Sequence, residues 1–189
     1  EVMFDGANIN GLNVPRRSAA GLARTFQISS LIDDFTALEN VMLAVQGHSR
    51  RSFSFFRRAA NDKVLTEPAM KHLGDAGLGD RAGEKAANLS HGERRQSELG
   101  MALALEPKAF LMDEPMAGIG PGGSVVLTSI LDGLRRQAPI LLVEHDMDAV
   151  FALADRITVL VGGKVIAHGS VDDIRNDARV LVAYLGEGA

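Results

Sequence analysis

The sequence predicts an α/β fold built around a parallel sheet, and the pattern downstream of Leu89 carries this prediction. Short apolar runs alternate there with helical patterns, in the order AFLMDEP, SVVLTSILDGLRRQ, PILLVEHD, MDAVFALA, RITVLV and GKVIAHG. The first and third runs are too short for helices and are bounded by Pro, Asp or Glu, which is typical of buried parallel strands. Alternation of strands and helices in this order indicates an α/β domain.

The upstream part predicts short mixed elements followed by helices. Residues 1–26 carry the turn signals FDG and NING, and SAAGLARTFQ is expected to run from a short helix into a strand. FTALENVMLAVQ predicts a helix that begins with a capping box formed by Thr36 and Glu39. Residues 61–79 are also expected to be helical, and short helices are expected over residues 170–185.

A basic run, HSRRSFSFFRR at residues 48–58, separates the two upstream helices. Basic residues interleaved with Phe suit a contact with a membrane surface or a partner protein. The same composition also suits a solvated loop whose aromatic side chains turn inward. Both interpretations stay open from the sequence.

Composition narrows the class of protein. The 189 residues suffice for one domain, or for one domain with a subdomain. The 20 Lys and Arg against 24 Asp and Glu give a net charge of −4, which does not favour a general nucleic-acid or anionic-membrane binder. The absence of Cys excludes disulfides and thiolate metal sites. No apolar run approaches the roughly 20 residues that span a bilayer, and no signal peptide is visible.

The stretch LSHGERRQ stands immediately before an apolar helical run. Ser90 and Glu93 have the S-x-x-E spacing of a capping box, in which each side chain satisfies a backbone N–H of the first turn. A helix N-terminus also carries unpaired N–H groups and a partial positive charge, which suit a phosphate. Gly92 would let such a ligand approach the backbone closely. The stretch is therefore interpreted either as a plain cap or as a phosphate contact.

Adjacent carboxylates end the run AFLMDEP. Ligands of open α/β sheets bind at the carboxyl ends of strands, which is where Asp113 and Glu114 are expected. Two neighbouring carboxylates repel each other unless a cation or a proton transfer uses them. Asp113 would then hold Mg²⁺, and Glu114 would position or deprotonate a water. The alternative is a strand end followed by a helix-capping acid.

Further polar residues end the other runs. LLVEHDMD delivers His145 to a strand end, and a parallel sheet would bring it near Asp113 and Glu114, where it could donate to a phosphate oxygen. A lone histidine is otherwise a structural residue. Gln27 ends RTFQ and could reach a metal or a water.

Together, LSHGE, the AFLMDEP carboxylates, the LLVEHD histidine and the upstream TFQ resemble the ATP-binding subunits of ABC transporters over essentially the whole chain. The resemblance implies an ABC-type P-loop NTPase fold, truncated at its N-terminus, with an inserted α-helical subdomain. It implies four parts: a remnant of the ATP-binding core at 1–27, the helical subdomain at 28–88, the signature helix and RecA-like α/β core at 89–169, and C-terminal helices at 170–189.

The resemblance also assigns a role to the opening of the LSHGE helix. Ser90, Gly92 and Glu93 match the signature motif, which completes the ATP site of the second subunit in a head-to-tail dimer. Ser90 and Gly92 would touch the γ-phosphate held by that subunit. A cap and a phosphate contact are compatible, because both use the same N–H groups. Arg94 and Arg95 are expected to serve the surface or a neighbouring helix instead of the phosphate.

The remaining candidates match the family's nucleotide-binding motifs. Asp113 matches the Walker B aspartate, which holds Mg²⁺, and Glu114 matches the catalytic glutamate. His145 is similar to the switch histidine. Gln27 is similar to the Q-loop glutamine, which also reaches Mg²⁺. The expected cofactors are therefore ATP and Mg²⁺.

The variant LSHGE, the phrase EPMAGIGP and the C-terminal RNDARVLVAYLGEGA resemble the uptake systems for branched-chain and related hydrophobic amino acids. The resemblance implies an ATPase subunit that drives this uptake. Its partners would be a second ATP-binding subunit, identical or not, and transmembrane permease subunits that the helical subdomain contacts. Its place would be peripheral, on the cytoplasmic face of the inner or plasma membrane. No nucleic-acid partner is expected, because tandem cassettes, long coiled coils and Cys-rich zinc modules are absent from the sequence.

Two departures from the family's pattern qualify the expected activity. No G-x-x-x-x-G-K-[ST] P-loop is present, since the only Gly-Lys pair, Gly163-Lys164, is followed by Val165. Without it the chain as given is expected to be inactive alone, because phosphoryl transfer depends on that cradle and its lysine. The start at Glu1 favours a fragment of a longer protein; the alternative is a truncated, non-catalytic module that completes a partner's ATP site. Gly120 also replaces the usual D-loop Asp, which removes a possible contact across the dimer.

Overall fold

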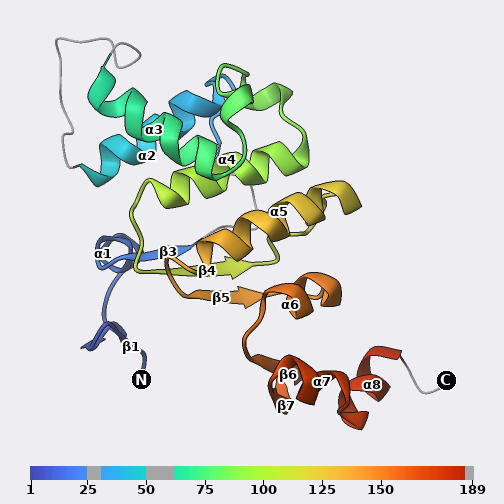
Figure 1. Cartoon of the computed structure of the whole chain (residues 1–189). Coiled ribbons are helices and arrows are strands. Elements are labelled where there is room, and N and C mark those ends of the chain that lie inside the picture. The colour runs from blue at the N-terminus through green and yellow to red at the C-terminus, as the bar shows by residue number, and fades with distance from the viewer. Residues whose placement is uncertain (25–30, 50–61, 186–189) are drawn as a thin grey trace. The chain divides into compact units, whose positions relative to one another are not determined.

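The structure is a computed structural model that describes residues 1–24, 31–49 and 62–185 (Figure 1). The chain forms two compact units, Glu1–Glu144 and His145–Ala189. Both units contain helices and strands, and strands alternate with helices from residue 109 to residue 161, as the sequence predicts for an α/β fold. The basic run lies largely outside the described residues, as does Gln27. The four predicted parts and their boundaries stay predictions.

The first unit contains a parallel sheet with the strand order β3-β4-β5. Its strands are β3 (Leu22–Arg24), β4 (Ala109–Asp113) and β5 (Ile140–Val143). The register aligns the ends of β4 and β5, since Asp113 pairs with Val143. Helix α5 (Pro121–Leu134) connects β4 to β5 (Figure 1). The prediction that AFLMDEP and PILLVEHD contain parallel strands is confirmed.

The prediction that both of these strands are buried is wrong for β5. Leu141 and Val143 are 65% and 55% exposed. Alternate residues of a strand point to opposite faces of the sheet. Phe110 and Met112 of β4 are buried on one face, whereas Leu141 and Val143 belong to the other. The exposure of Leu141 and Val143 shows that this second face of β5 is open to solvent in the described part of the unit.

A helical cluster completes the first unit. It consists of α2 (Ala37–His48), α3 (Lys63–Asp75) and α4 (His91–Leu103), joined by the short 3₁₀ turns η2 (Gly79–Arg81) and η3 (Ala86–Asn88). Buried aliphatic side chains at helical spacing form its core: Ala37, Val41, Met42, Val45, Leu65, Ala69, Leu73, Leu78, Leu89 and Ala104. The predicted capping box at the start of α2 is confirmed.

Helix α3 ends at Asp75, earlier than the predicted 79, for a local reason. Gly77 adopts a φ of +75°, a left-handed conformation that glycine accepts without steric cost. The Leu78 N–H donates to the Leu73 carbonyl at 3.0 Å, and the Gly77 N–H donates to the Gly74 carbonyl at 2.9 Å. This is a Schellman motif, which stops a helix while satisfying its last carbonyls.

A buried side chain fastens the start of the described segment 31–49. Asn40 is fully buried in α2. Its Oδ1 accepts the Ile32 N–H at 2.8 Å, and its Nδ2 donates to the Ile32 and Thr36 carbonyls at 3.2 and 3.0 Å. Residues 32–36 are thereby held against α2.

The N-terminal residues form small elements, as expected. Strands β1 (Met3–Phe4) and β2 (Ala7–Asn8) make an antiparallel hairpin. Helix α1 (Val14–Ala19) follows and leads into β3. The order of helix and strand is as predicted, but the helix lies mostly upstream of SAAGLARTFQ, the stretch in which it was expected.

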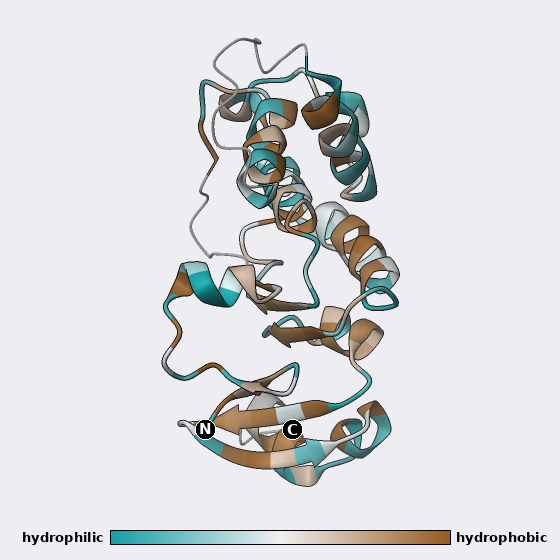
Figure 2. Cartoon of the chain, turned by 90° about the vertical axis from the view of Figure 1, so that its left-hand side faces the viewer, coloured by the Kyte–Doolittle hydropathy of each residue, from teal (hydrophilic) through white to brown (hydrophobic). Residues whose placement is uncertain are grey.

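The second unit contains α6 (Met147–Leu153), β6 (Ile157–Val161), β7 (Lys164–Gly169), α7 (Val171–Arg175) and α8 (Ala178–Leu185). Strands β6 and β7 pair antiparallel, and Figure 2 shows their largely apolar colouring. Gly162 and Gly163, both at positive φ, form the tight turn between them. One face of the hairpin packs against α7 and α8. The buried residues of this core are Ile157, Val159, Ala167, Ile174 and Val180.

Candidate functional site

Asp113 ends β4 at the carboxyl edge of the parallel sheet. Its side chain is 46% exposed, and its Oδ2 lies 3.9 Å from Nη2 of Arg24, at the end of the neighbouring strand β3. An ion pair this exposed and this long contributes little to stability. The carboxylate of Asp113 is therefore accessible from solvent, and its ion pair with Arg24 is not a buried one.

The turn after Asp113 has an unusual backbone. Glu114 has a φ of +46°, which costs a residue with a side chain about 1–2 kcal/mol. Its N–H donates to the Val143 carbonyl at 2.8 Å, so the ladder between β4 and β5 continues into the turn. Strain of this kind persists where the surroundings fix the backbone, and it collects at functional sites.

A glutamate directly after β5 holds the far end of the same turn. Oε1 of Glu144 accepts the N–H of Met116 at 2.8 Å. The N–H of Ala117 in turn donates to the Glu114 carbonyl at 3.0 Å. Sequence reasoning gave Glu144 no role, because its target is a backbone group 28 residues away. Its place directly before His145 was the available signal.

The first turn of α4 contains the predicted capping box. Oγ of Ser90 accepts the Glu93 N–H at 3.4 Å, while Oε2 of Glu93 accepts both the N–H and the hydroxyl of Ser90 at 2.8 Å. The other Glu93 oxygen lies 3.1 Å from Nε of Arg81. The Ser90 N–H, then the Ser90 hydroxyl and the Arg81 charge, lower the pKa of Glu93 below its usual value.

Gly92 in this turn has no internal reason to lack a side chain. A Cβ built on it would lie 3.8 Å from Cγ2 of Ile119, an ordinary contact, and its φ is not in the left-handed region. Packing within the described residues would therefore tolerate alanine here. A glycine at this point leaves room for a group from outside the chain.

The arginines after the signature residues bind neighbouring protein groups. Arg94 donates to the Ala86 carbonyl at 2.7 Å and to Asp33 at 2.8 Å. Arg95 pairs with Glu98 of its own helix at 2.9 Å, and both side chains are largely buried. Both arginines therefore have partners within the chain, and the expectation that they serve the surface or a neighbouring helix instead of the phosphate stays a prediction.

His145 and Gln27 are not placed against the carboxylates. His145 begins the second unit, whose position relative to the first is not defined, and Gln27 lies outside the described residues. Their predicted roles stay predictions. The neighbouring Asp146 caps α6 by accepting the Asp148 and Ala149 N–H groups.

The donor set at the end of β4 suits one kind of metal. Among the described residues, no cluster of three or more His, Asp or Glu side chains is arranged to hold an ion. Asp113 offers a single exposed carboxylate. Mg²⁺ in nucleotide sites is held by one or two carboxylates, with waters and substrate phosphates filling its other positions. The residues present therefore fit Mg²⁺ that arrives with a nucleotide.

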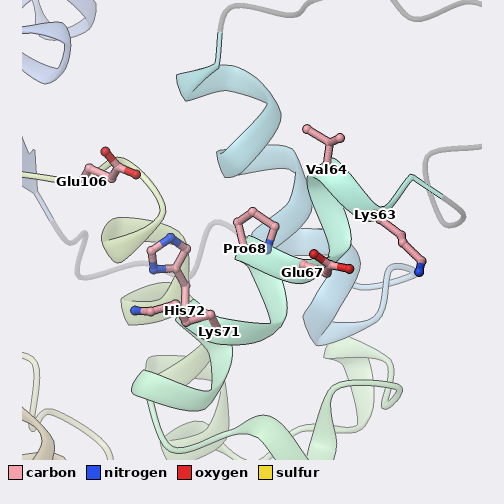
Figure 3. Close-up of a pocket in the computed structure, with 7 residues that line it drawn as sticks. All are labelled: Lys63, Val64, Glu67, Pro68, Lys71, His72 and Glu106. Atoms are coloured by element: carbon pink, nitrogen blue, oxygen red, sulfur yellow. The ribbon is translucent and has the colours of Figure 1, made fainter.

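A pocket of about 550 Å³ lies elsewhere, on α3 and the residue Glu106 beyond α4 (Figure 3). Side chains of both charge signs line it, among them Lys71 and Glu106, together with His72. Burial, then the Lys71 charge, lowers the pKa of His72. None of the predicted site residues lines this pocket. It is therefore separate from the carboxylate edge, meaning the end of β4 with Asp113 and Glu114.

Ligands of open α/β sheets bind at the carboxyl ends of the strands, and Asp113 lies at such an end here. Comparison with known proteins identifies the family to which the chain belongs. The chain matches the family model for ABC transporters over residues 1–117 and that for branched-chain amino acid ATP-binding cassette transporters over residues 164–189. The chain belongs to the ABC transporter family, as an ATP-binding subunit.

Curated relatives agree with this assignment. The chain is 32% identical over 193 residues to the high-affinity branched-chain amino acid transport ATP-binding protein BraF of Pseudomonas aeruginosa, covering 98% of this chain and 76% of the relative. It is also 32% identical over 196 residues to LivG of Escherichia coli, with the same coverage.

Solved structures confirm the ABC-type fold. A nucleotide-free ATP-binding cassette from an ABC transporter superposes with a TM-score of 0.79 at 28% identity, covering 97% of this chain and 76% of that one. The ADP conformation of the cassette MJ1267 gives a TM-score of 0.78 at 26% identity, with the same coverage. In the described part of the chain, no helix has both the length and the hydropathy needed to cross a membrane.

Proposed function

We propose that the chain powers the uptake of branched-chain amino acids by binding and hydrolysing ATP on the cytoplasmic face of a membrane. Membership of the ABC transporter family supports the ATPase role. The names of the relatives BraF and LivG, together with the C-terminal match over residues 164–189, support the substrate class. The observation that carries the mechanism is the exposed Asp113 beside the strained Glu114 at the end of β4.

At this edge, Asp113 would hold Mg²⁺, and Glu114 would accept a proton from the attacking water. When bound, Mg²⁺ would supply positive charge that neutralises the phosphate oxygens. The exposed carboxylate of Asp113 supports the first role, and the fixed turn of Glu114 supports the second. In this proposal, Gln27 would complete the metal site, and His145 would donate to a phosphate oxygen.

A second copy or a related subunit brings ATP to the first turn of α4. Ser90 and Gly92 contact the γ-phosphate there, and Glu93 holds Ser90 in place. The exposed Ser90 hydroxyl and the unexplained glycine at position 92 support this arrangement. Transmembrane permease subunits then receive the motion through the helical cluster.

The catalytic proposal is tested by changing Glu114. The 189 residues contain no G-x-x-x-x-G-K-[ST] loop, so hydrolysis is measured on a chain in which a Walker A segment precedes them. E114Q is expected to lower turnover by about 100-fold or more, since it removes a general base, and to leave ATP binding intact. E67Q, an exposed change on α3, is the matched control.

Unchanged turnover in E114Q would refute the role of Glu114. Stimulation of turnover by leucine in the complete transporter, but not by a polar amino acid, would support the substrate class. Robust turnover that needs a Walker A segment from a different partner chain would favour the alternative of a non-catalytic module.

A further inference from the structure

We propose that Glu144 is a positioning residue for Glu114: its carboxylate fixes the turn that presents the catalytic carboxyl group. The proposal rests on the proposed function of Glu114 as the proton acceptor. It adds a residue that directly follows a different strand, β5, and that does not itself touch the nucleotide.

The turn between Glu114 and Ala117 needs anchors because its backbone is strained. A φ of +46° at Glu114 lies in a region that residues with a Cβ rarely adopt. Such a conformation survives only where neighbouring groups leave no alternative. Pro115 follows directly and has no N–H to donate. The donors available on either side of the proline are therefore those of Glu114 and Met116.

Both of these donors are bound by consecutive residues at the end of β5. The Glu114 N–H donates to the Val143 carbonyl, and the Met116 N–H donates to Oε1 of Glu144, each at 2.8 Å. The first bond is backbone to backbone, so side-chain changes leave it in place. The second depends on one carboxylate, and bonds to a charged acceptor are stronger than neutral ones.

The Met116 bond lies where water cannot easily replace it. Met116 is 6% exposed, and Glu144 is only partly exposed. A buried N–H without an acceptor is costly, so loss of the carboxylate should drive the turn to a different backbone conformation. Because Glu114 sits two residues upstream, the direction of its carboxyl group would change with the turn.

Glu144 also precedes His145 in the chain. The same short segment therefore carries the anchor of the turn and the predicted switch histidine.

The test compares E144Q, which keeps an oxygen acceptor, with E144A, which removes it. In the 189-residue chain, amide hydrogen exchange at Met116 should become at least about tenfold faster in E144A and stay near that of the unchanged chain in E144Q. In the chain preceded by a Walker A segment, E144A should lower kcat about tenfold with the KM for ATP within about twofold, and E144Q should restore most of kcat.

D62A is the matched control. It removes another bond between a carboxylate and a backbone N–H, from Asp62 to Val64 at 3.1 Å, at the start of α3. Exchange at Met116 and kcat should not change in this variant. If E144A does not fold, E144D, whose shorter side chain withdraws the acceptor, takes its place.

Normal kcat in E144A, with E114Q inactive, would overturn the positioning role and leave the proposed function standing. A defect in E144Q as large as in E144A would also overturn it, because the acceptor is then not what matters. Full turnover in E114Q would instead refute the proposed function itself.

Discussion

Substitution of Ser90 distinguishes two roles of its hydroxyl group, the helix cap and the proposed phosphate contact. In the capping box, this hydroxyl accepts the Glu93 N–H at 3.4 Å and donates to the Glu93 carboxylate at 2.8 Å. In the proposed function, it also contacts the γ-phosphate held by another subunit. S90A and S90G both delete the hydroxyl, but they differ in how well the backbone tolerates the N-cap position.

The magnitude follows from the geometry of the cap. Replacing an N-cap serine by alanine costs about 1 kcal/mol on average, and replacing it by glycine costs a few tenths. The bond to the Glu93 N–H is long, and Ser90 is exposed, so water can replace part of what is lost. We therefore expect about 0.5–1 kcal/mol for S90A, which corresponds to a fall in Tm of about 1–4 °C for a chain of this size.

The assay measures thermal unfolding at pH 7 by circular dichroism, alongside ATP-dependent association of subunits that carry a Walker A segment. Stability should fall in the order unchanged chain, S90G, S90A. Association should fall equally in both variants, because both lack the hydroxyl. Equal stability of S90A and the unchanged chain would refute the cap. Normal association of S90G would refute the phosphate contact, whatever its stability.

Other predictions concern the helical cluster. N40A should lower the free energy of unfolding by about 2–3 kcal/mol in urea titrations, since it removes a fully buried side chain and its three hydrogen bonds to Ile32 and Thr36. N88A, at an exposed position, should change it by less than about 0.5 kcal/mol. G77A should cost more than about 1 kcal/mol, because φ is +75° and the new Cβ would lie 2.9 Å from a side-chain nitrogen, while G83A, with open space, should be nearly neutral. The pKa of Glu93 is lowered from 4.5, so its ionised carboxylate stabilises the fold above pH 4.5, and this contribution is lost as the pH falls through the lowered pKa. The unchanged chain should therefore be more stable than E93Q above pH 4.5, and the difference should vanish in acid. A difference in stability that persists at pH 2 would contradict this cause.

Local signals in the sequence predicted local structure well. The capping boxes at Thr36 and Ser90 need only a residue and its neighbour three positions on, so spacing alone identifies them. The strand at residues 109–113 is similarly marked by an apolar run and a terminal proline. In each case the residues that determine the local structure lie within a few positions of one another in the sequence.

Features that depend on distant neighbours could not be predicted in this way. The apolar run of β5 has the composition of a buried strand, yet burial depends on what packs on each face, and Leu141 lies on the open one. The antiparallel pairing of β6 and β7 was likewise missed, although Gly162-Gly163 marks a hairpin turn. An alternating pattern of elements therefore gives the fold class, but not the surroundings of each strand.

The carboxylate edge combines both situations. The sequence places Asp113 and Glu114 at a strand end, but an acidic residue followed by proline gives no warning of a left-handed backbone. That conformation opposes local preference, so contacts from elsewhere in the chain must maintain it. Glu144, directly after the neighbouring strand β5, supplies such a contact. Where the observed backbone opposes local preference, the side chain that stabilises it is worth mutating first. Here that side chain is Glu144, and it is a stronger candidate than the other residues next to Asp113 and Glu114.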